Sequence, residues 1–376
     1  MRADEAKLVP LTTALSSTVI SGYVDVGAQY NIGNYTQGAG VPAGTFANKV
    51  DNFSLNNVDI ALDKPQDESP WASGYHIDIN AGTDAVGTFL NGAQSTTSSG
   101  TASVALRQAY VVIRTPIGNG IDWKVGVQDD IIGYEGNTDG ANPNYTRSIG
   151  YFNEPTTLLG LIGSYKIVDG VTIQGGIADA TTPAFGATSS DKTFAAALAL
   201  TAPDSWGWAK GATLNLGTLL NIDGGGQQNY YAGLTVPTPL SILKVGAAFD
   251  LVSYNNQNTA TNPHNDNGWV VGVYGVLQPT DKLSFNLRGE YYDFQGGSIA
   301  MGATGVALNP NYLFSNGKGE EVTATIQYNL WANVISRLEF RWDHADSGKA
   351  FGIPSLTPSY PNADSFLLAA NLIYTF

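Results

Sequence analysis

The sequence of 376 residues predicts an all-β protein: a closed antiparallel transmembrane β-barrel of about 16 strands, with short periplasmic turns and long extracellular loops. Three observations support this. Apolar and polar residues alternate with a period of two along most of the chain. Only 13% of residues are charged, yet no stretch reaches the roughly 18 apolar residues that a spanning helix needs. Breaks between the alternating stretches are, in turn, short and long.

The alternation is clearest near the C-terminus. In "DKLSFNLRGEYYDF", Leu283, Phe285 and Leu287 share one face, whereas Arg288 and Glu290 share the other. The pattern recurs in "EEVTATIQYNL" and "SRLEFRWDH", and more weakly in "YVDVGAQY", "VDIALD", "YHIDINAG", "IDWKVGVQ", "VTIQGGI" and "LKVGAAFD". Small apolar residues with aromatics near strand ends on one face, and opposite charges on the other, favour lipid outside and water inside over the buried core of a sandwich.

In one stretch, "ALRQAYVVIR", the alternation does not show which residues face the lumen. If Leu106 and Tyr110 point outward, so do Gln108 and Arg114. A bulge could reset the alternation, so Arg107 and Arg114 are left unassigned.

The breaks define two edges. Short ones are "PIGNG", "DG" at 169–170, "PTPL", "PTD" and the turn near Asn333, and long ones lie near 32–48, 85–101, 131–155, 255–266, 296–317 and 347–360. "NIDGGGQQ" is short where the pattern requires a long break. We expect a polar N-terminal segment, 1–16, followed by one barrel domain, 17–376. "MRADEAKLVP" lacks the apolar core of a signal peptide, so the sequence of an exported protein would be that of a processed chain or of one given a new Met1.

The chain ends in strict alternation. "SFLLAANLIYTF" places large or apolar side chains at every second position, namely Phe366, Leu368, Ala370, Leu372, Tyr374 and Phe376. Every backbone N–H and C=O group must be paired in a membrane, so the last strand must pair with the first, near "ISGYVDVGAQY". Phe376 is therefore expected to face lipid at the periplasmic rim. The alternative is the core strand of a soluble protein.

The block at 107–167 resembles the putative β-barrel porin-2 (OmpL-like) family. The matching features are Gly118 and Gly120 in the turn, "KVG" at 124–126, "GYE" at 133–135, "NPNYTRS" at 142–148 and "EP" at 154–155; "ISGYVDVGAQYN" and the terminal "YTF" also fit. The resemblance implies an outer-membrane pore and offers no catalytic residues to carry over to this sequence. The end of the chain, with Leu372, Tyr374 and Phe376, also resembles the signal read by the bacterial outer-membrane assembly machinery.

The long break 131–155 is the candidate constriction, by analogy with a long loop that narrows general porins. It contains Glu135, Asp139 and Glu154 against Arg147, a net charge of −2. Charged side chains predicted to face the lumen from the wall are Asp25, Asp59, His76, Asp78, Asp122, Lys124, Lys166, Arg288, Glu290, Arg337, Glu339, Arg341 and Asp343. The alternative for each is ordinary solvated polarity and pairing between strands.

Other chemistry finds little support. The chain has no Cys, and none of its three His residues, His76, His264 and His344, has a His partner at metal-site spacing. No G-x-S-x-G elbow occurs, and "NPHNDNG" at 262–268 lacks the terminal Glu of a calcium loop. The net charge of −14 disfavours nucleic acid. We therefore expect no enzyme, no cofactor and no metal site.

The sequence thus predicts an outer-membrane porin that lets small hydrophilic solutes or ions diffuse, with a preference for cations. Expected partners are outer-membrane lipid and lipopolysaccharide, the assembly machinery and two further copies in a homotrimer. Two alternatives remain open: a non-conducting barrel that anchors the envelope or a surface partner, and a soluble β-sandwich or solenoid.

Overall fold

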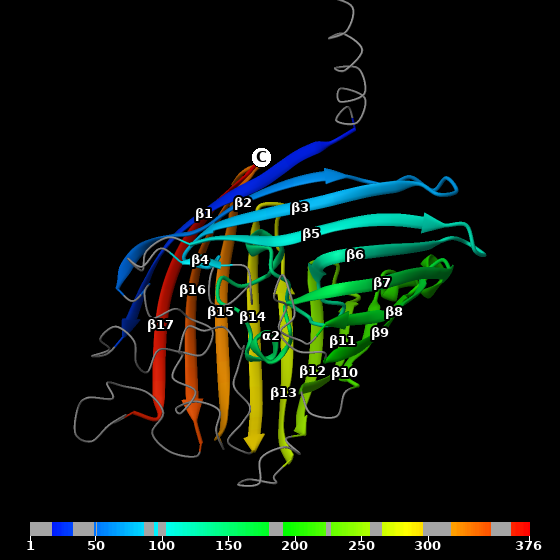
Figure 1. Ribbon diagram of the computed structural model, residues 1–376. Coiled ribbons are helices and arrows are strands. Elements are labelled where there is room, and N and C mark those ends of the chain that lie inside the picture. Colours follow the sequence, from blue (N-terminus) through cyan, green and yellow to red (C-terminus); the bar gives the residue numbers. More distant parts are fainter. Residues whose placement is uncertain are drawn as a thin grey trace, which may run out of the picture.

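Sixteen antiparallel strands form a closed cylinder in the computed structural model (Figure 1). The structure describes residues 17–32, 49, 51–85, 94–96, 103–179, 191–222, 227–255, 265–295, 317–346 and 362–376. The barrel strands are β1 (Val19–Ile32), β2 (Asn52–Lys64), β3 (Ser73–Gly82), β5 (Ser103–Thr115), β6 (Ile121–Asp129), β7 (Thr157–Val168), β8 (Val171–Asp179), β9 (Lys192–Thr201), β10 (Thr213–Asn221), β11 (Gln227–Pro237), β12 (Leu243–Asn255), β13 (Asn265–Leu277), β14 (Leu283–Gln295), β15 (Gly317–Trp331), β16 (Val334–Ala345) and β17 (Asp364–Thr375). A further short strand, β4 (Gln94–Thr96), pairs with β5.

The last strand closes the cylinder against the first, as the alternation predicted. β17 pairs with β1 from Phe366 to Thr375. The backbone of Phe376 then exchanges two hydrogen bonds with Gly22, at 3.1 and 3.0 Å. The terminal residue is therefore part of the wall, and its ring is half exposed on the outside.

Side chains divide between two faces. On β14 the outward Leu287 is 56% exposed, whereas its neighbours Arg288 and Asn286 are buried on the inner face. Exposed aromatic residues lie toward both edges, and those at the short-turn edge are Trp71, Trp206, Trp208, Trp331, Tyr374 and Phe376. An apolar outer band with aromatic residues at its edge is the arrangement of a barrel in lipid, which confirms the predicted fold class.

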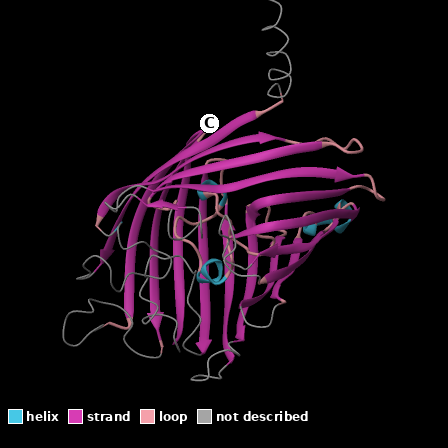
Figure 2. Ribbon diagram, in the orientation of Figure 1, coloured by secondary structure: helices cyan, strands magenta, loops and turns pink. Residues whose placement is uncertain are grey.

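Short turns join the strands at 116–120, 169–170, 238–242, 278–282 and 332–333. At the opposite edge, the longest break described in full is 130–156. The other predicted long breaks, the middle of "NIDGGGQQ" and the segment 1–16 lie wholly or largely outside the described residues. The helices of the described chain are short (Figure 2), and none has both the length and the apolar character to cross a membrane.

A bulge decides the phase of β5. Asp78 pairs with Gln108 and Ile79 with Leu106, so Arg107 is the extra residue. Both Arg107 and Gln108 are buried. A bulge of this kind lets two successive side chains turn to the same face, which answers the question left open by "ALRQAYVVIR".

The inner face is not polar throughout, which corrects the simplest form of the inside–outside prediction. Inward residues of β7–β13 form an apolar cluster that includes Leu158, Ile162, Ala195 and Leu219. Ile132, from the break 130–156, belongs to the same cluster. This arc is apolar because it packs against a segment of the chain instead of facing water.

Candidate functional site

The segment 130–156, between β6 and β7, lies inside the barrel (Figure 1). It contains a 3-10 turn, η2 (Asp139–Ala141), and a short helix, α2 (Ile149–Asn153). We call it the inner segment. Its hydrogen bonds and packing reach strands on both sides of the cylinder, as the following contacts show.

A wall carboxylate caps helix α2. The first N–H groups of a helix have no partner within it and attract negative charge. Glu290 of β14 accepts from the N–H groups of Ile149 and Gly150, at 2.7 and 3.0 Å. The Ser148 hydroxyl accepts from the N–H of Tyr151 at 3.0 Å. The helix is thus attached by its N-terminus to the wall.

A second wall carboxylate, Glu339 of β16, holds the stretch before the helix. It accepts from the N–H groups of Tyr145 and Thr146, at 2.5 and 2.9 Å. Arg337, two residues earlier on the same inner face, donates to the carbonyl oxygens of Asp139 and Asn142, at 3.0 and 2.6 Å. Both side chains pair with backbone groups that water would otherwise solvate.

Arg288 of β14 is the centre of the charged contacts. Its guanidinium lies 2.9 Å from Glu135 of the inner segment and 3.1 Å from Glu321 of β15. It also donates to the carbonyl of Thr146 at 2.7 Å. The side chains of Arg288, Glu135 and Glu321 have no solvent exposure. A planar group with five donors can bind several acceptors at once, which a lysine cannot do in this geometry.

The opposite side of the inner segment contacts β11–β13 mainly through apolar and amide groups. The Tyr134 ring stacks on Tyr274 with centroids 4.0 Å apart, and its hydroxyl bonds Thr235 at 3.1 Å. Asn229 donates to the carbonyl of Asn153 at 2.7 Å. The segment therefore spans the interior from an apolar arc to a charged one.

The four residues predicted to form the constriction are all in this segment and all buried. Glu135 pairs with Arg288, and Asp139 pairs with Arg147 at 2.8 Å. Glu154, which lies outside the strands, shares a hydrogen bond with the Asp250 carboxyl. Burial, and then the charge of that neighbour, raise the pKa of Glu154 well above its ordinary value. All four therefore help to hold the segment, and their effect on ion selection stays a prediction.

The predicted wall residues fall into two groups. Nine are buried on the inner face: Asp25, Asp59, Asp78, Arg288, Glu290, Arg337, Glu339, Arg341 and Asp343. Four lie toward the short-turn edge and keep more contact with solvent: His76, Asp122, Lys124 and Lys166.

In the second group, Lys124 lies over the Tyr110 ring at 4.7 Å, and that ring stacks on His76. Asp122 pairs with Arg114 at 2.7 Å. Lys166 is largely exposed beside the turn, where it pairs with Asp169 at 2.6 Å.

Some residues at the site were missed from the sequence. Glu321 was available from the alternation, since it precedes Thr323 and Thr325 on one face of β15. Arg107 contacts Asp78 at 2.9 Å and Asp129 at 2.6 Å. Its inward position could not be predicted without knowledge of the bulge in β5. No local sequence pattern distinguishes Asp250, because its role depends on the hydrogen bond with Glu154, which is distant in the sequence.

Comparisons with known proteins agree with this geometry. The family model described as "Putative beta-barrel porin-2, OmpL-like" matches residues 17–376. The chain belongs to this family. It is thus an outer-membrane porin, and its barrel lies in the outer membrane. The search of curated proteins returned no match.

Three solved structures share the porin fold with this chain at low sequence identity. The outer membrane channel DcaP of Acinetobacter baumannii has a TM-score of 0.59 at 12% identity, over 96% of this chain and 97% of that one. The trimer form of Vibrio cholerae OmpT has a TM-score of 0.58 at 10% sequence identity, over 96% of this chain and 99% of that one. The anion-selective porin of Comamonas acidovorans has a TM-score of 0.56 at 10% sequence identity, over 96% of this chain and 99% of that one. At these identities the likeness shows the fold alone.

Proposed function

We propose that this porin is a passive channel for small hydrophilic solutes and ions, with residues 17–376 acting as one barrel domain. The supporting observation is the inner segment, which crosses the interior and is bonded to both sides of it. Toward the short turns, inward side chains such as Asn215 and Lys244 remain exposed. The pore of this proposal is a wide periplasmic vestibule that narrows at residues 131–155.

We further propose a preference for cations. Selectivity depends on the local field of the charges that line a pore. Among buried charged residues of the described chain, acidic ones outnumber the basic ones, which are Lys49, Arg107, Arg147, Arg288, Arg337 and Arg341. The anion-selective porin of similar fold does not bear on this, because lumen charges differ between proteins that share a barrel.

Planar-bilayer recording tests both proposals. Purified protein should give stepwise conductance, and a KCl gradient should give a reversal potential of the sign expected for cations. The dense packing of the inner segment favours one competing function, a barrel that anchors the envelope without conducting. Folded protein that inserts but passes no current would establish that alternative, and an anion-type reversal potential would contradict the proposed preference.

The exposed Lys124 offers a test of lumen electrostatics. Lys124→Glu should increase the cation-to-anion permeability ratio by about twofold, because it exchanges a positive for a negative charge on the vestibule wall. Lys210→Glu is the matched control: Lys210 lies in the turn between β9 and β10 and pairs with the exposed Asp204. Equal shifts in both variants would show that overall charge, and not the vestibule, sets the ratio.

We propose a homotrimer, in keeping with the trimer form of the Vibrio cholerae protein of similar fold. Outer-membrane lipid and lipopolysaccharide would surround the remaining outer surface. The mass of the protein–detergent complex, corrected for bound detergent, distinguishes a trimer from a monomer.

The terminal ring is proposed as part of the signal for the assembly machinery. Phe376→Ser should lower the amount of assembled barrel in cells several-fold, while protein refolded in detergent should fold as well as the wild type. Phe53→Ser removes another outward, highly exposed ring and serves as the control. Equal cellular levels of both variants would contradict a special role for Phe376.

A further inference from the structure

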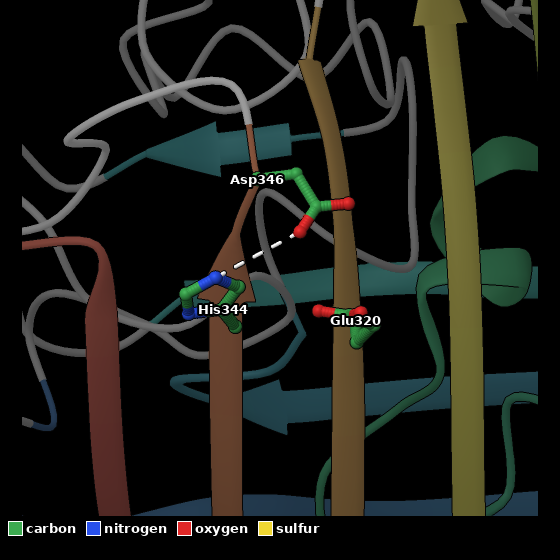
Figure 3. A group of neighbouring side chains, drawn as sticks. All are labelled: Glu320, His344 and Asp346. Atoms are coloured by element: carbon green, nitrogen blue, oxygen red, sulfur yellow. Dashed lines mark ion pairs between the residues drawn. The ribbon is translucent and has the colours of Figure 1, made fainter.

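Three side chains with metal-binding atoms meet at the long-loop edge of β15 and β16. Glu320, His344 and Asp346 each present a ligand atom, and these atoms all lie within 4.8 Å of one another (Figure 3). Glu320 and His344 are directly opposed across the two strands. The backbone N–H of Asp346 donates to the carbonyl of Lys318 at 2.8 Å, which holds the third residue beside the other two.

The group lies on the outer face of the barrel. His344 follows the outward residues Phe340 and Trp342 at alternate positions of β16, while Arg341 and Asp343 between them are buried inside. The rings of Trp342 and His344 have centroids 5.8 Å apart. The group therefore has no part in the lumen or in the contacts of the inner segment.

A fourth residue orients the imidazole. Nδ1 of His344 lies 2.8 Å from Oδ1 of Asp364 on β17, and the same oxygen accepts from the indole N–H of Trp342 at 2.9 Å. A carboxylate can only accept, so Nδ1 carries the proton and Nε2 of the neutral ring has a free lone pair. A carboxylate behind a histidine in this way is the usual support of a metal ligand.

The free nitrogen points toward the other ligands. Nε2 lies 3.7 Å from Oδ1 of Asp346, the separation marked by the dashed line in Figure 3. That separation is too long for a hydrogen bond. Two ligands bound at roughly 2.0–2.2 Å to a tetrahedral zinc ion are about 3.4 Å apart, so the gap suits a shared metal better than direct contact.

Local charge also favours a cation. Glu320, Asp346 and Asp364 place three carboxylates around one imidazole. Among the described residues, the basic side chain beside the group, Lys318, has another acidic partner, since it pairs with Asp293 at 2.8 Å. A divalent ion would relieve the repulsion between Glu320 and Asp346.

We propose that Glu320, His344 Nε2 and Asp346 bind a divalent transition-metal ion of the Zn²⁺ class, with water completing the shell. An imidazole ligand suits zinc, nickel or copper better than magnesium or calcium, which prefer oxygen ligands alone. The site is separate from conduction, so it stands or falls independently of the porin function.

The test is a Zn²⁺ titration of the full, folded protein in detergent, in which calorimetry measures the binding. The wild type should bind one Zn²⁺ per chain at this site, with proton release at low pH. His344→Asn should weaken that binding at least about tenfold, and Asp364→Asn should weaken it about 10- to 100-fold through loss of orientation. His76→Asn is the matched control, because His76 also bonds an aspartate, Asp63 at 3.0 Å, but has no metal-site neighbours among the described residues.

Each outcome is decisive once heat-modifiable migration shows that the variants are folded. Loss in His344→Asn with retention in His76→Asn supports the site, and so does an X-ray absorption spectrum with one imidazole among N/O ligands. Absence of stoichiometric binding in the wild type overturns it. So does unchanged binding in His344→Asn, or displacement of Zn²⁺ by equimolar Mg²⁺ or Ca²⁺, because either result would mean a carboxylate cluster without the imidazole.

Discussion

Replacing Arg288 with alanine is expected to raise single-channel conductance by about twofold or more, because the charged contact between β14 and Glu135 of the inner segment is lost. Arg288 neutralises Glu135 and Glu321 where water does not reach. Removing one partner of such a buried network leaves uncompensated charge and costs about 3–5 kcal/mol. Detachment of part of the inner segment from the wall would let water solvate the unpaired carboxylates and so remove this cost. The pore should therefore widen.

Two further variants make the result interpretable. Arg288→Lys keeps the positive charge but not the planar fork, so its conductance should lie between those of the wild type and Arg288→Ala. Arg114→Ala is the control, since Arg114 also belongs to the inner wall but bonds Asp122 and the carbonyl of Asn119. Wild-type conductance in folded Arg288→Ala would mean that the inner segment does not limit the current.

The second large effect is expected from two neighbours on β10. Leu216→Arg should prevent or strongly reduce assembly, whereas Asn215→Arg should assemble like the wild type. Leu216 is exposed on the outer face, where an arginine facing lipid costs up to about 2–4 kcal/mol, depending on its depth. Asn215 is exposed on the inner face, where water can solvate the guanidinium.

The measurement is the fraction of heat-modifiable, folded barrel in membranes and after refolding into lipid vesicles. The pair is matched in strand, depth and substituted residue, so local propensity cancels. If the two variants assemble equally well or equally badly, the division of β10 into a lipid face and a water face is wrong.

The unpaired backbone groups of the inner segment explain why it makes so many contacts with the wall. A chain inside a barrel must satisfy its backbone groups without the ladder of a strand. Glu290, Glu339 and Arg337 perform this task by bonding backbone groups directly, and Arg288 adds charge pairing. These wall residues were predicted to line the lumen, and the structure shows that the segment covers them.

The alternation of the sequence determined the strands, their two faces and the closure by the last residue. It could do so because successive side chains of a strand point to opposite faces by covalent geometry alone, so the signal is local. Lipid acts on the outer face of every strand in the same way, so the outward apolar pattern of Leu283 to Leu287 is repeated around the wall. The inner face follows the polar half of the pattern only outside the apolar arc of β7–β13.

Tertiary structure alone decided which residues meet across the barrel. Glu290 and α2 are about 140 residues apart in the sequence, and no period connects them. The bulge at Arg107, the apolar arc around Leu158 and the group at His344 likewise depend on register and on which strands become neighbours. A sequence pattern reports which face a side chain occupies, whereas its partner is fixed only when the cylinder closes.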